Sequence, residues 1–325
     1  MSSINARQVA LVVGASRGIG RQIAIDLAKE GYAVVVAAKS TTAEADLAKL
    51  SPFPPNPNSP QSTITTVARE ITLAGGEATA IPVDTTKYES IQELIAKTIQ
   101  VYSRLDVLVY NSGAIWWGPV ATTPMKRFQL MQRVNIEGLY GVVQEALPHL
   151  KARAGGSAES AGERRGPRIV VVCPPIYSRF FRGKTAYAIG KVGMSVLVKG
   201  LGMDFEREGL VEQGLGITGL WPAVAIESAA TEQFTSKDPS YAKDLRKPTI
   251  FSDAILAMLR VPAAVVNGQL ELDEDFLRKQ AGITDFSKYS VVPGATPRRI
   301  MPAELPDLTV KEQDDEGMRV DSSRL

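Results

Sequence analysis

A tyrosine and a lysine are the two residues of this chain best suited to proton transfer. Tyr187 and Lys191 lie in the run Tyr-Ala-Ile-Gly-Lys, and this spacing places two side chains on the same face of a helix. A free tyrosine has a pKa of about 10, and a neighbouring ammonium group favours the phenolate. We therefore expect Lys191 to lower the pKa of Tyr187 and to make it an acid–base catalyst near neutral pH.

A glycine-rich turn gives the second chemical signal. The segment Gly14-Ala15-Ser16-Arg17-Gly18-Ile19-Gly20 follows a predicted strand and opens a predicted helix. Glycines permit a tight turn and a close approach of the backbone to a phosphate, and the free N–H groups of a helix N-terminus attract anions. The turn therefore predicts binding of a dinucleotide pyrophosphate.

The rest of the composition argues against other chemistry. His149 is the only histidine and Cys173 the only cysteine, which disfavours a His-ligated zinc site, a Ser-His-Asp triad and an internal disulfide. We expect no metal. The formal net charge of +2 gives no electrostatic reason to expect nucleic acid as a partner. No apolar run approaches the roughly 18–20 residues that a membrane span needs.

Apolar runs alternate with helical patterns along most of the chain. Strands are predicted at 9–13, 33–38, 78–83, 105–110, 168–173, 217–221 and 268–272. Helices are predicted at about 17–30, 63–74, 87–102, 125–150, 185–208 and 252–260. Short apolar strands separated by helices indicate a parallel sheet covered on both faces. The predicted fold is α/β, a doubly wound Rossmann-type domain with about seven strands.

Three segments interrupt this alternation within one predicted domain, residues 1–300. A proline-rich insertion at 51–60 cannot form a helix or a central strand, because proline removes backbone donors. The stretch 152–167, rich in Gly, Ser and charge, is predicted to be a mobile loop, and 223–247 a lid-like segment. The acidic tail, 301–325, is predicted to be disordered.

The order of the motifs resembles the short-chain dehydrogenase/reductase family. The first turn has the family's spacing, Gly-x-x-x-Gly-x-Gly. The matching elements that follow in order are Asp84-Thr85, Asn111-Ser112-Gly113-Ala114, Asn135, Tyr187 with Lys191, and Trp221-Pro222 with Ile226-Glu227-Ser228. They span roughly residues 8–230. The resemblance implies an enzyme that transfers a hydride to or from a nicotinamide dinucleotide.

The resemblance also implies a role for each matched residue. Tyr187 would exchange a proton with the substrate oxygen, Lys191 would hold the nicotinamide ribose, and Asn135 would anchor a water that leads protons to solvent. Tyr187 and Lys191 would also contact the cofactor. The other implied cofactor-binding residues are Gly14, Ser16, Arg17, Gly18, Ile19, Gly20, Lys39, Asp84, Thr85, Asn111, Ser112, Gly113, Pro222, Ile226 and Ser228.

The end of the second predicted strand favours NADP(H) over NAD(H). An acidic residue there would repel the 2′-phosphate of NADP(H), whereas a basic residue would attract it. The strand ends with Lys39 and has no carboxylate before Glu44, and Arg17 in the first turn is a second cation. Two cations and no acid predict NADP(H); the alternative is that Lys39 is only a solvated lysine at a strand end.

The family's catalytic serine has no counterpart in this chain. The residue 13 positions before Tyr187 is Pro174, and proline cannot donate a hydrogen bond. Cys173, Tyr177 or Ser178 could turn inward, although Cys173 suits a buried strand end. Removing one donor to an oxyanion can cost about 10²–10³ in rate. The main hypothesis is an NADP(H)-dependent reductase of a hydrophobic carbonyl or alcohol. The alternative is an NADP(H)-binding isomerase, cyclase or sensor without hydride transfer.

Apolar side chains near these motifs are expected to contact the substrate. They are Trp116, Trp117, Ile176, Phe180 and Phe181. Two adjacent tryptophans face different ways, so at most one of them is a good pocket residue. Phe180 and Phe181 are equally well explained by packing.

The later part of the chain narrows the resemblance to one subgroup. Residues 268–277, 282–286 and 292–294 are similar to the hydroxysteroid dehydrogenase-like proteins, whose animal members carry a sterol-carrier domain. We expect no such domain here, since 301–325 leaves no room for one. The subgroup and Ser323-Arg324-Leu325, a variant of the Ser-Lys-Leu address, imply a peroxisomal location and an import receptor as partner. A cytoplasmic location is the alternative, and the family's habits imply a homodimer or homotetramer.

Overall fold

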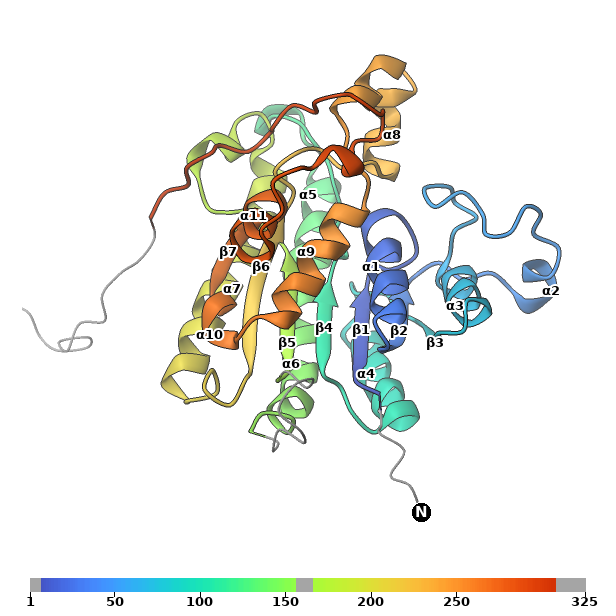
Figure 1. Ribbon diagram of the computed structural model, residues 1–325, viewed down its shortest axis with the longest axis vertical. Coiled ribbons are helices and arrows are strands. Elements are labelled where there is room, and N and C mark those ends of the chain that lie inside the picture. Colours follow the sequence, from blue (N-terminus) through green and yellow to red (C-terminus); the bar gives the residue numbers. More distant parts are fainter. Residues whose placement is uncertain (1–6, 156–165, 308–325) are drawn as a thin grey trace, which may run out of the picture.

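The computed structural model in Figure 1 describes residues 7–155 and 166–307. Its strands form one parallel sheet in the order β3-β2-β1-β4-β5-β6-β7. They are β1 (Val9–Val13), β2 (Ala33–Ala38), β3 (Glu77–Pro82), β4 (Val107–Tyr110), β5 (Arg168–Val172), β6 (Gly216–Trp221) and β7 (Gln269–Leu272). The predicted doubly wound α/β fold is confirmed.

Helices pack on both faces of this sheet (Figure 1). They are α1 (Gly18–Lys29), α2 (Glu44–Leu47), α3 (Ile64–Leu73), α4 (Tyr88–Tyr102), α5 (Met125–Gln132), α6 (Gly138–Lys151), α7 (Thr185–Arg207), α8 (Ala229–Thr235), α9 (Thr249–Arg260), α10 (Ala263–Val266) and α11 (Asp273–Ala281). Every predicted helix is present. The sequence patterns missed α2, α8, α10 and α11, because these helices are too short to show an apolar periodicity over several turns.

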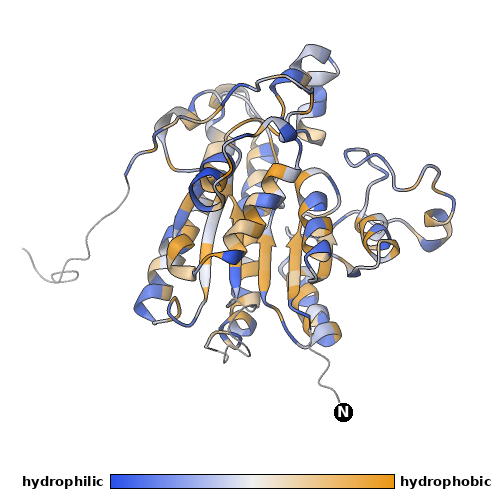
Figure 2. Cartoon of the chain, in the orientation of Figure 1, coloured by the Kyte–Doolittle hydropathy of each residue, from blue (hydrophilic) through white to orange (hydrophobic). Residues whose placement is uncertain are grey.

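Two apolar layers, one on each face of the sheet, form the core. Successive residues of a strand point to opposite faces, so Val12 packs in the layer with Ile23 of α1, and Leu11 packs in the layer with Met194 of α7. Figure 2 shows apolar residues along the central strands and polar residues on the outer sides of the helices. Burial on both faces explains why the strand sequences are apolar runs without alternation.

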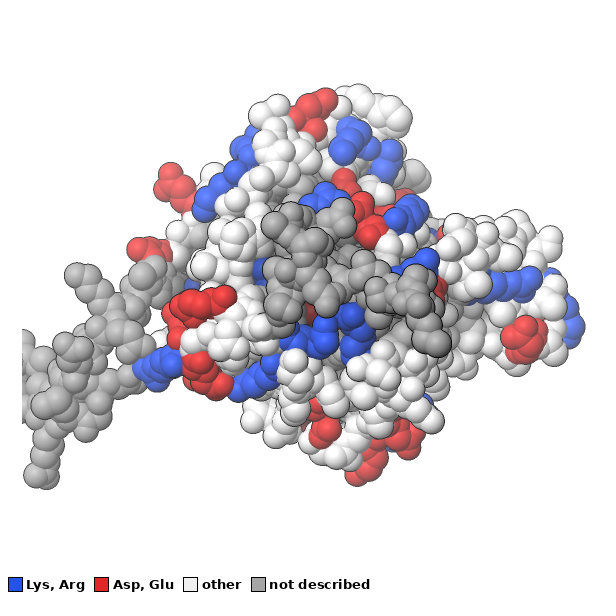
Figure 3. Space-filling model, turned by 60° about the horizontal axis from the view of Figure 1, so that its bottom comes forward, with Lys and Arg blue, Asp and Glu red and all other residues white. Residues whose placement is uncertain are grey.

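The parallel strands bring their carboxyl ends to one edge of the sheet, at the top of Figure 1. The strand order reverses at β1, which pairs with β2 on one side and with β4 on the other. Ligands of doubly wound sheets bind in the crevice at this reversal. The opposite end of the molecule, turned forward in Figure 3, shows basic and acidic side chains intermixed.

Among the other predicted segments, the lid-like segment is described in full, and the loop and the tail are described in part. The lid-like segment contains α8 and a 3₁₀ turn, Pro239–Asp244. Residues 156–165 of the predicted loop and 308–325 of the tail, including Ser323, Arg324 and Leu325, lie outside the described residues. Met301 is buried. Among the described helices, none combines the length and apolar character required to cross a bilayer.

Candidate active site

A cleft of about 550 Å³ lies at the carboxyl edge of the sheet, beside the glycine turn. Its volume is in the range of small-molecule sites. The predicted cofactor residues that line it are Gly14, Ser16, Arg17, Lys39, Asp84, Thr85, Asn111, Ser112 and Gly113. Leu130 and Val134 line the cleft as well. Sequence reasoning missed these two, although they lie one helical turn apart on the predicted helix that carries Asn135.

The glycine turn packs directly against the loop after β4. A Cβ on Gly14, whose φ is +89°, would lie 2.6 Å from the Ser112 nitrogen, and one on Gly20 would lie 2.2 Å from the Gly14 oxygen. The Asn111 amide donates to that same Gly14 oxygen at 2.9 Å. Any side chain at these two glycines would force the loop and the turn apart, and both form the wall of the cleft.

The segment after β6 closes the other side of the turn. Ser228 lies over it, since a Cβ on Gly18 would be 3.4 Å from the Ser228 Cβ. Ile226 is buried, and Pro222 and Ile19 are half-buried. Of these predicted cofactor residues, Ser228 contacts the turn, and none of the four lines the cleft itself.

Lys39 at the end of β2 is paired with an acid. Its ammonium lies 2.8 Å from the Asp84 carboxylate, and hydrogen bonds from Lys39 and Thr86 lower the pKa of Asp84 to about 2. Lys39 and Arg17 are both exposed at the cleft. The prediction of two cations and no acid considered only the end of β2, whereas Asp84 comes from the neighbouring segment after β3.

Two of the three predicted catalytic residues, Asn135 and Lys191, converge on Gly113. A Cβ at Gly113 would lie 3.5 Å from Asn135 Oδ1 and 3.5 Å from Lys191 Nζ. Tyr187, one turn before Lys191 on α7, is 4% exposed, and Lys191 is 3% exposed. The Lys191 ammonium also lies 5.4 Å from the centre of a Trp221 ring. The cluster therefore combines a phenol, an ammonium and an amide with little access to water.

The lowering of the Tyr187 pKa was expected from Lys191 together with the positive nicotinamide ring, and Lys191 alone does not produce it in the protein without cofactor. Burial raises the pKa of Tyr187, because desolvation disfavours the phenolate. Burial also lowers the pKa of Lys191 to about 8, and its ammonium donates to the Val172 carbonyl at 2.7 Å. Desolvation of both groups outweighs the attraction that the sequence argument considered.

Asn135 joins the helix to the loop after β4. Its side-chain oxygen accepts from the Ala114 N–H at 2.8 Å, and its amide donates to the Ala114 carbonyl at 3.2 Å. Asn135 lies in a π-helical turn, Arg133–Glu137, between α5 and α6, and such turns are frequent at functional sites. Each polar end of the Asn135 side chain therefore bonds the backbone of Ala114, which fixes the loop after β4 to this turn.

Pro174 stands at the position of the missing serine, and its backbone is packed against α7. Pro174 is buried, and its carbonyl accepts a hydrogen bond from Ser195 of α7 at 2.6 Å. Cys173 packs in the core, as predicted for a strand-end cysteine, and burial raises the pKa of its thiol to about 12. The Tyr177 hydroxyl lies 3.6 Å from Met301 Sδ. The side chain of Ser178 lies outside what the structure describes.

Comparison with known proteins decides the family. A family model described as short chain dehydrogenase matches residues 8–51 and 58–223. The chain belongs to the short-chain dehydrogenase family. Its members are NAD(P)-dependent oxidoreductases, so the predicted enzyme class is confirmed. The six residues between the two matched parts, 52–57, fall in the predicted proline-rich insertion.

Relatives over most of the chain agree with the predicted subgroup. The chain is 34% identical over 285 residues to hydroxysteroid dehydrogenase-like protein 2 of Danio rerio and 32% identical to that of Homo sapiens. The match covers 87% of this chain and only 60% of each relative. A putative dehydrogenase from Xanthomonas campestris, a solved structure, is 34% identical with a TM-score of 0.73, and the match covers 94% of this chain and 98% of that one.

Aromatic residues form the side of this dehydrogenase site away from the glycine turn. Phe180 is buried, with ring centres 6.2 Å from Tyr187 and 5.9 Å from Trp221. Trp117 stacks on Phe234 of α8 at 5.5 Å. Ile176 and Phe181 are half-buried. Trp221 and Phe234 were not named as substrate residues, although Trp221 belongs to the Trp221-Pro222 motif and Phe234 lies in the lid-like segment, which was expected on the substrate side.

The two adjacent tryptophans face different ways, as predicted. Trp117 faces α8, whereas Trp116 packs under the Arg127 guanidinium of α5 at 4.8 Å. Their exposed fractions are 43% and 36%. Only Trp117 therefore contacts the lid-like segment through this stack.

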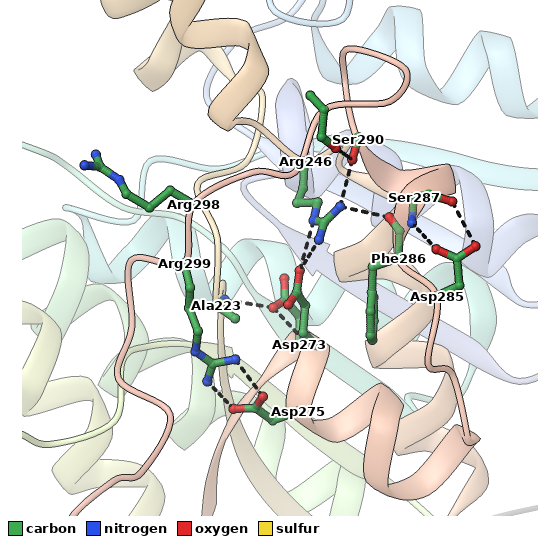
Figure 4. Close-up of polar contacts among 12 residues, drawn as sticks. Ala223, Arg246, Asp273, Asp275, Asp285, Phe286, Ser287, Ser290, Arg298 and Arg299 are labelled. Carbon is green, nitrogen blue, oxygen red and sulfur yellow. Dashed lines mark hydrogen bonds and ion pairs between the residues drawn. The ribbon is translucent and has the colours of Figure 1, made fainter.

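The loop after β6 is fixed by residues beyond the matched family region (Figure 4). The Ala223 N–H donates to Asp273 Oδ1 at 2.8 Å, and the Ala223 carbonyl accepts from the Ile300 and Met301 N–H groups. Arg299 pairs with Asp275. The N–H and the carbonyl of Ala223, the residue after Pro222, are thus bonded to α11 and to the C-terminal segment.

The carboxyl group of Asp273, at the start of α11, makes the stability of the folded protein depend on pH. Burial raises its pKa to about 7, helped by the nearby charges of Glu274 and Asp275, while the unfolded chain has an ordinary value of about 4. The folded state therefore holds a proton that the unfolded state loses. Stability from this group is fully present below about pH 4 and falls as the pH rises to about 7.

Asp273→Asn should therefore flatten the pH dependence of the unfolding free energy between about pH 4 and pH 7. Urea unfolding at several pH values measures this. Asp253→Asn, a change of the same kind at a half-exposed carboxylate, serves as the control and should keep the slope. An unchanged slope in Asp273→Asn would contradict the raised pKa.

Proposed function

We propose that this short-chain dehydrogenase transfers a hydride between NADP(H) and a hydrophobic carbonyl or alcohol. One observation carries the proposal: Asn135 and Lys191 meet at Gly113, which lines the cleft, and the buried Tyr187 lies one turn before Lys191 on α7. The residues present fit a nicotinamide dinucleotide. The N-terminus of α1 suits its pyrophosphate, and the lining of the cleft includes Gly113, next to Asn135 and Lys191, as well as Lys39.

The nicotinamide, when bound, supplies or accepts the hydride. Tyr187 would give its proton to the substrate oxygen during reduction, and its raised pKa keeps it protonated for this role. Lys191 would hold the ribose through the ammonium N–H groups that its bond to the Val172 carbonyl leaves over. The aromatic side chains of Phe180 and Trp221 keep water from the cluster, which strengthens its electrostatic interactions.

The proposed substrate is apolar because of what surrounds Tyr187. Phe180 packs on the Tyr187 ring, and Trp117 with Phe234 forms a second aromatic surface at the lid-like segment. Trp117 is 43% exposed, so it offers apolar area to a ligand. Burial of apolar area drives binding in such sites.

Deuterium transfer tests the proposed reaction. NADPH deuterated at C4, on either face, is incubated with the protein and a panel of apolar ketones, aldehydes and enones. A product one mass unit heavier, found by mass spectrometry, is the expected result. If the protein binds NADPH but no compound of a broad panel acquires deuterium, the evidence would favour the alternative below.

NADP(H) rather than NAD(H) is proposed because Lys39 and Arg17 line the cleft. Lys39→Asp replaces a cation that would meet the 2′-phosphate with a second acid beside Asp84. We expect the ratio of NADPH to NADH affinity to fall about 10–100-fold, the range of a charge-assisted hydrogen bond. Titration by fluorescence measures both affinities.

Lys49→Asp, at an exposed lysine outside the cleft, is the control and should leave this ratio within about twofold. A wild-type protein that binds NADH more tightly than NADPH would refute the choice of cofactor. It would leave the hydride-transfer proposal intact.

The replacement of the usual serine by Pro174 favours a second candidate, an NADP(H)-binding protein without hydride transfer. Pro174 offers no donor to a substrate oxygen, and its carbonyl is already bonded to Ser195. In this candidate the site would serve an isomerase, a cyclase or a sensor. The buried Tyr187 and Lys191 argue for the reductase, because a binding protein has no chemical need for a proton donor.

Three further expectations remain predictions: import into peroxisomes through Ser323, Arg324 and Leu325, the cytoplasmic alternative, and assembly as a homodimer or homotetramer. The first depends on residues outside the described part of the chain.

A further inference from the structure

The proline-rich segment between α2 and α3 reaches the glycine turn of the cofactor site. The Gly18 N–H donates to the Pro57 carbonyl at 3.1 Å, and the Ser62 hydroxyl donates to the Ser16 carbonyl at 2.7 Å. Asn58 Oδ1 lies 3.6 Å from the position of a Cβ on Gly18. The segment therefore contacts the turn at the place where the cofactor phosphates are expected.

The Gly18 N–H is one of the donors that a phosphate would use. Gly18 is the first residue of α1, and the first N–H groups of a helix have no partner within it. Here the donor is taken by a carbonyl oxygen. Carbonyl and phosphate oxygens are both acceptors and repel each other, so a phosphate that bonds to Gly18 has to displace Pro57.

The segment is anchored at its two ends, and one buried polar atom between them lacks a partner among the described residues. The Arg69 guanidinium lies 4.9 Å from the centre of the Phe53 ring, and Thr63 caps α3. Asn58 Oδ1, between these anchors, is buried without a hydrogen-bond partner in the described structure. A buried acceptor without a partner costs stability, which makes the closed position of the segment weaker.

The family model has no counterpart of residues 52–57, since its match ends at 51 and resumes at 58. Pro57, which takes the Gly18 N–H, belongs to this insertion. The family's fold therefore forms without these residues. The contact of Pro57 with the turn is therefore made by a residue that the family model lacks.

We propose that residues 52–62 form a gate over the phosphate end of the cofactor site, which withdraws from Gly18 when a dinucleotide pyrophosphate binds. This proposal depends on the proposed dinucleotide cofactor. If the site binds cofactor only when the gate is open, the apparent Kd equals the intrinsic Kd divided by the fraction of molecules with an open gate. Loosening the gate therefore makes NADPH bind faster and more tightly, whereas loss of a structural support would make it bind more weakly.

Ser62→Ala removes the Ser62–Ser16 hydrogen bond and tests the gate. Stopped-flow NADPH fluorescence should show an association rate constant about 3–10-fold higher and a Kd lower by a similar factor, as expected for one hydrogen bond. Ser59→Ala removes a bond of the same type, from Ser59 to the Asn56 carbonyl, within the segment. Because that bond does not touch the turn, this control should stay within about twofold.

Deletion of 52–57 is the second variant and should raise the association rate further. Hydrogen exchange provides an independent measure on the wild-type protein, in which amides of 52–62 should exchange faster when NADPH saturates the site. A higher Kd in Ser62→Ala, or slower exchange of 52–62 with NADPH, would overturn the gate. Unchanged rates in both variants would do the same. A wild-type protein that binds neither NADPH nor NADH would instead refute the proposed cofactor, and the gate with it.

Discussion

Tyr187→Phe is expected to lower the rate of hydride transfer by about 10²–10⁴, the usual contribution of a general acid. The substitution removes only the hydroxyl, so the ring keeps its contact with Phe180 and the helix keeps its packing. NADPH affinity should change by less than about twofold. Single-turnover deuterium transfer, followed by mass spectrometry, measures the chemical step without product release.

Tyr241→Phe is the matched control for this variant. Tyr241 lies in the lid-like segment, with its ring 5.4 Å from Phe234, and the change again removes one hydroxyl. We expect its rate to stay within a few-fold of the wild type. Hydride transfer that survives in Tyr187→Phe at more than about a tenth of the wild-type rate would mean that another group gives the proton.

Arg246→Met is expected to reduce the free energy of unfolding by about 3–5 kcal/mol, the usual cost of breaking a buried ion pair from one side. The Arg246 guanidinium bonds Glu274 at 2.8 Å, and it donates to the Phe286 carbonyl and the Ser290 hydroxyl, each at 2.9 Å (Figure 4). Methionine fills a similar volume but leaves all three acceptors without their donor. Urea unfolding measures the change.

The loss should also reach the cofactor site. The Arg246 backbone pairs with the segment after β6, through the Ala225 carbonyl and the Glu227 N–H, and this segment places Ile226 and Ser228. NADPH affinity should fall in the same variant.

Arg260→Met is the control, because the Arg260–Glu30 pair is exposed and such pairs contribute at most about 1 kcal/mol. Equal losses in the two variants would show that burial of the Arg246 pair does not matter. Changing Arg246 and Glu274 together to Met and Leu should recover part of the stability, since no unpaired charge remains.

The sequence alone determined the fold and the family, because the signals for both are local. Runs such as Val9–Val13 and Ala33–Ala38 are apolar at every position, which identifies strands buried on both faces. The glycine turn and the Tyr187–Lys191 spacing are readable within a few residues. The order of such motifs was sufficient to predict the doubly wound sheet and the residues that meet at its carboxyl edge.

Only the tertiary structure decided the chemistry of several of these residues. Lys39 pairs with Asp84, Ala223 with Asp273, and Gly18 with Pro57; each pair is far apart in the sequence, so no local pattern predicts it. Burial among Phe180 and its other neighbours raises the pKa of Tyr187, because desolvation disfavours the phenolate. Residue types and spacing specify which groups are present, whereas distance and burial, which arise only on folding, set their partners and their charge.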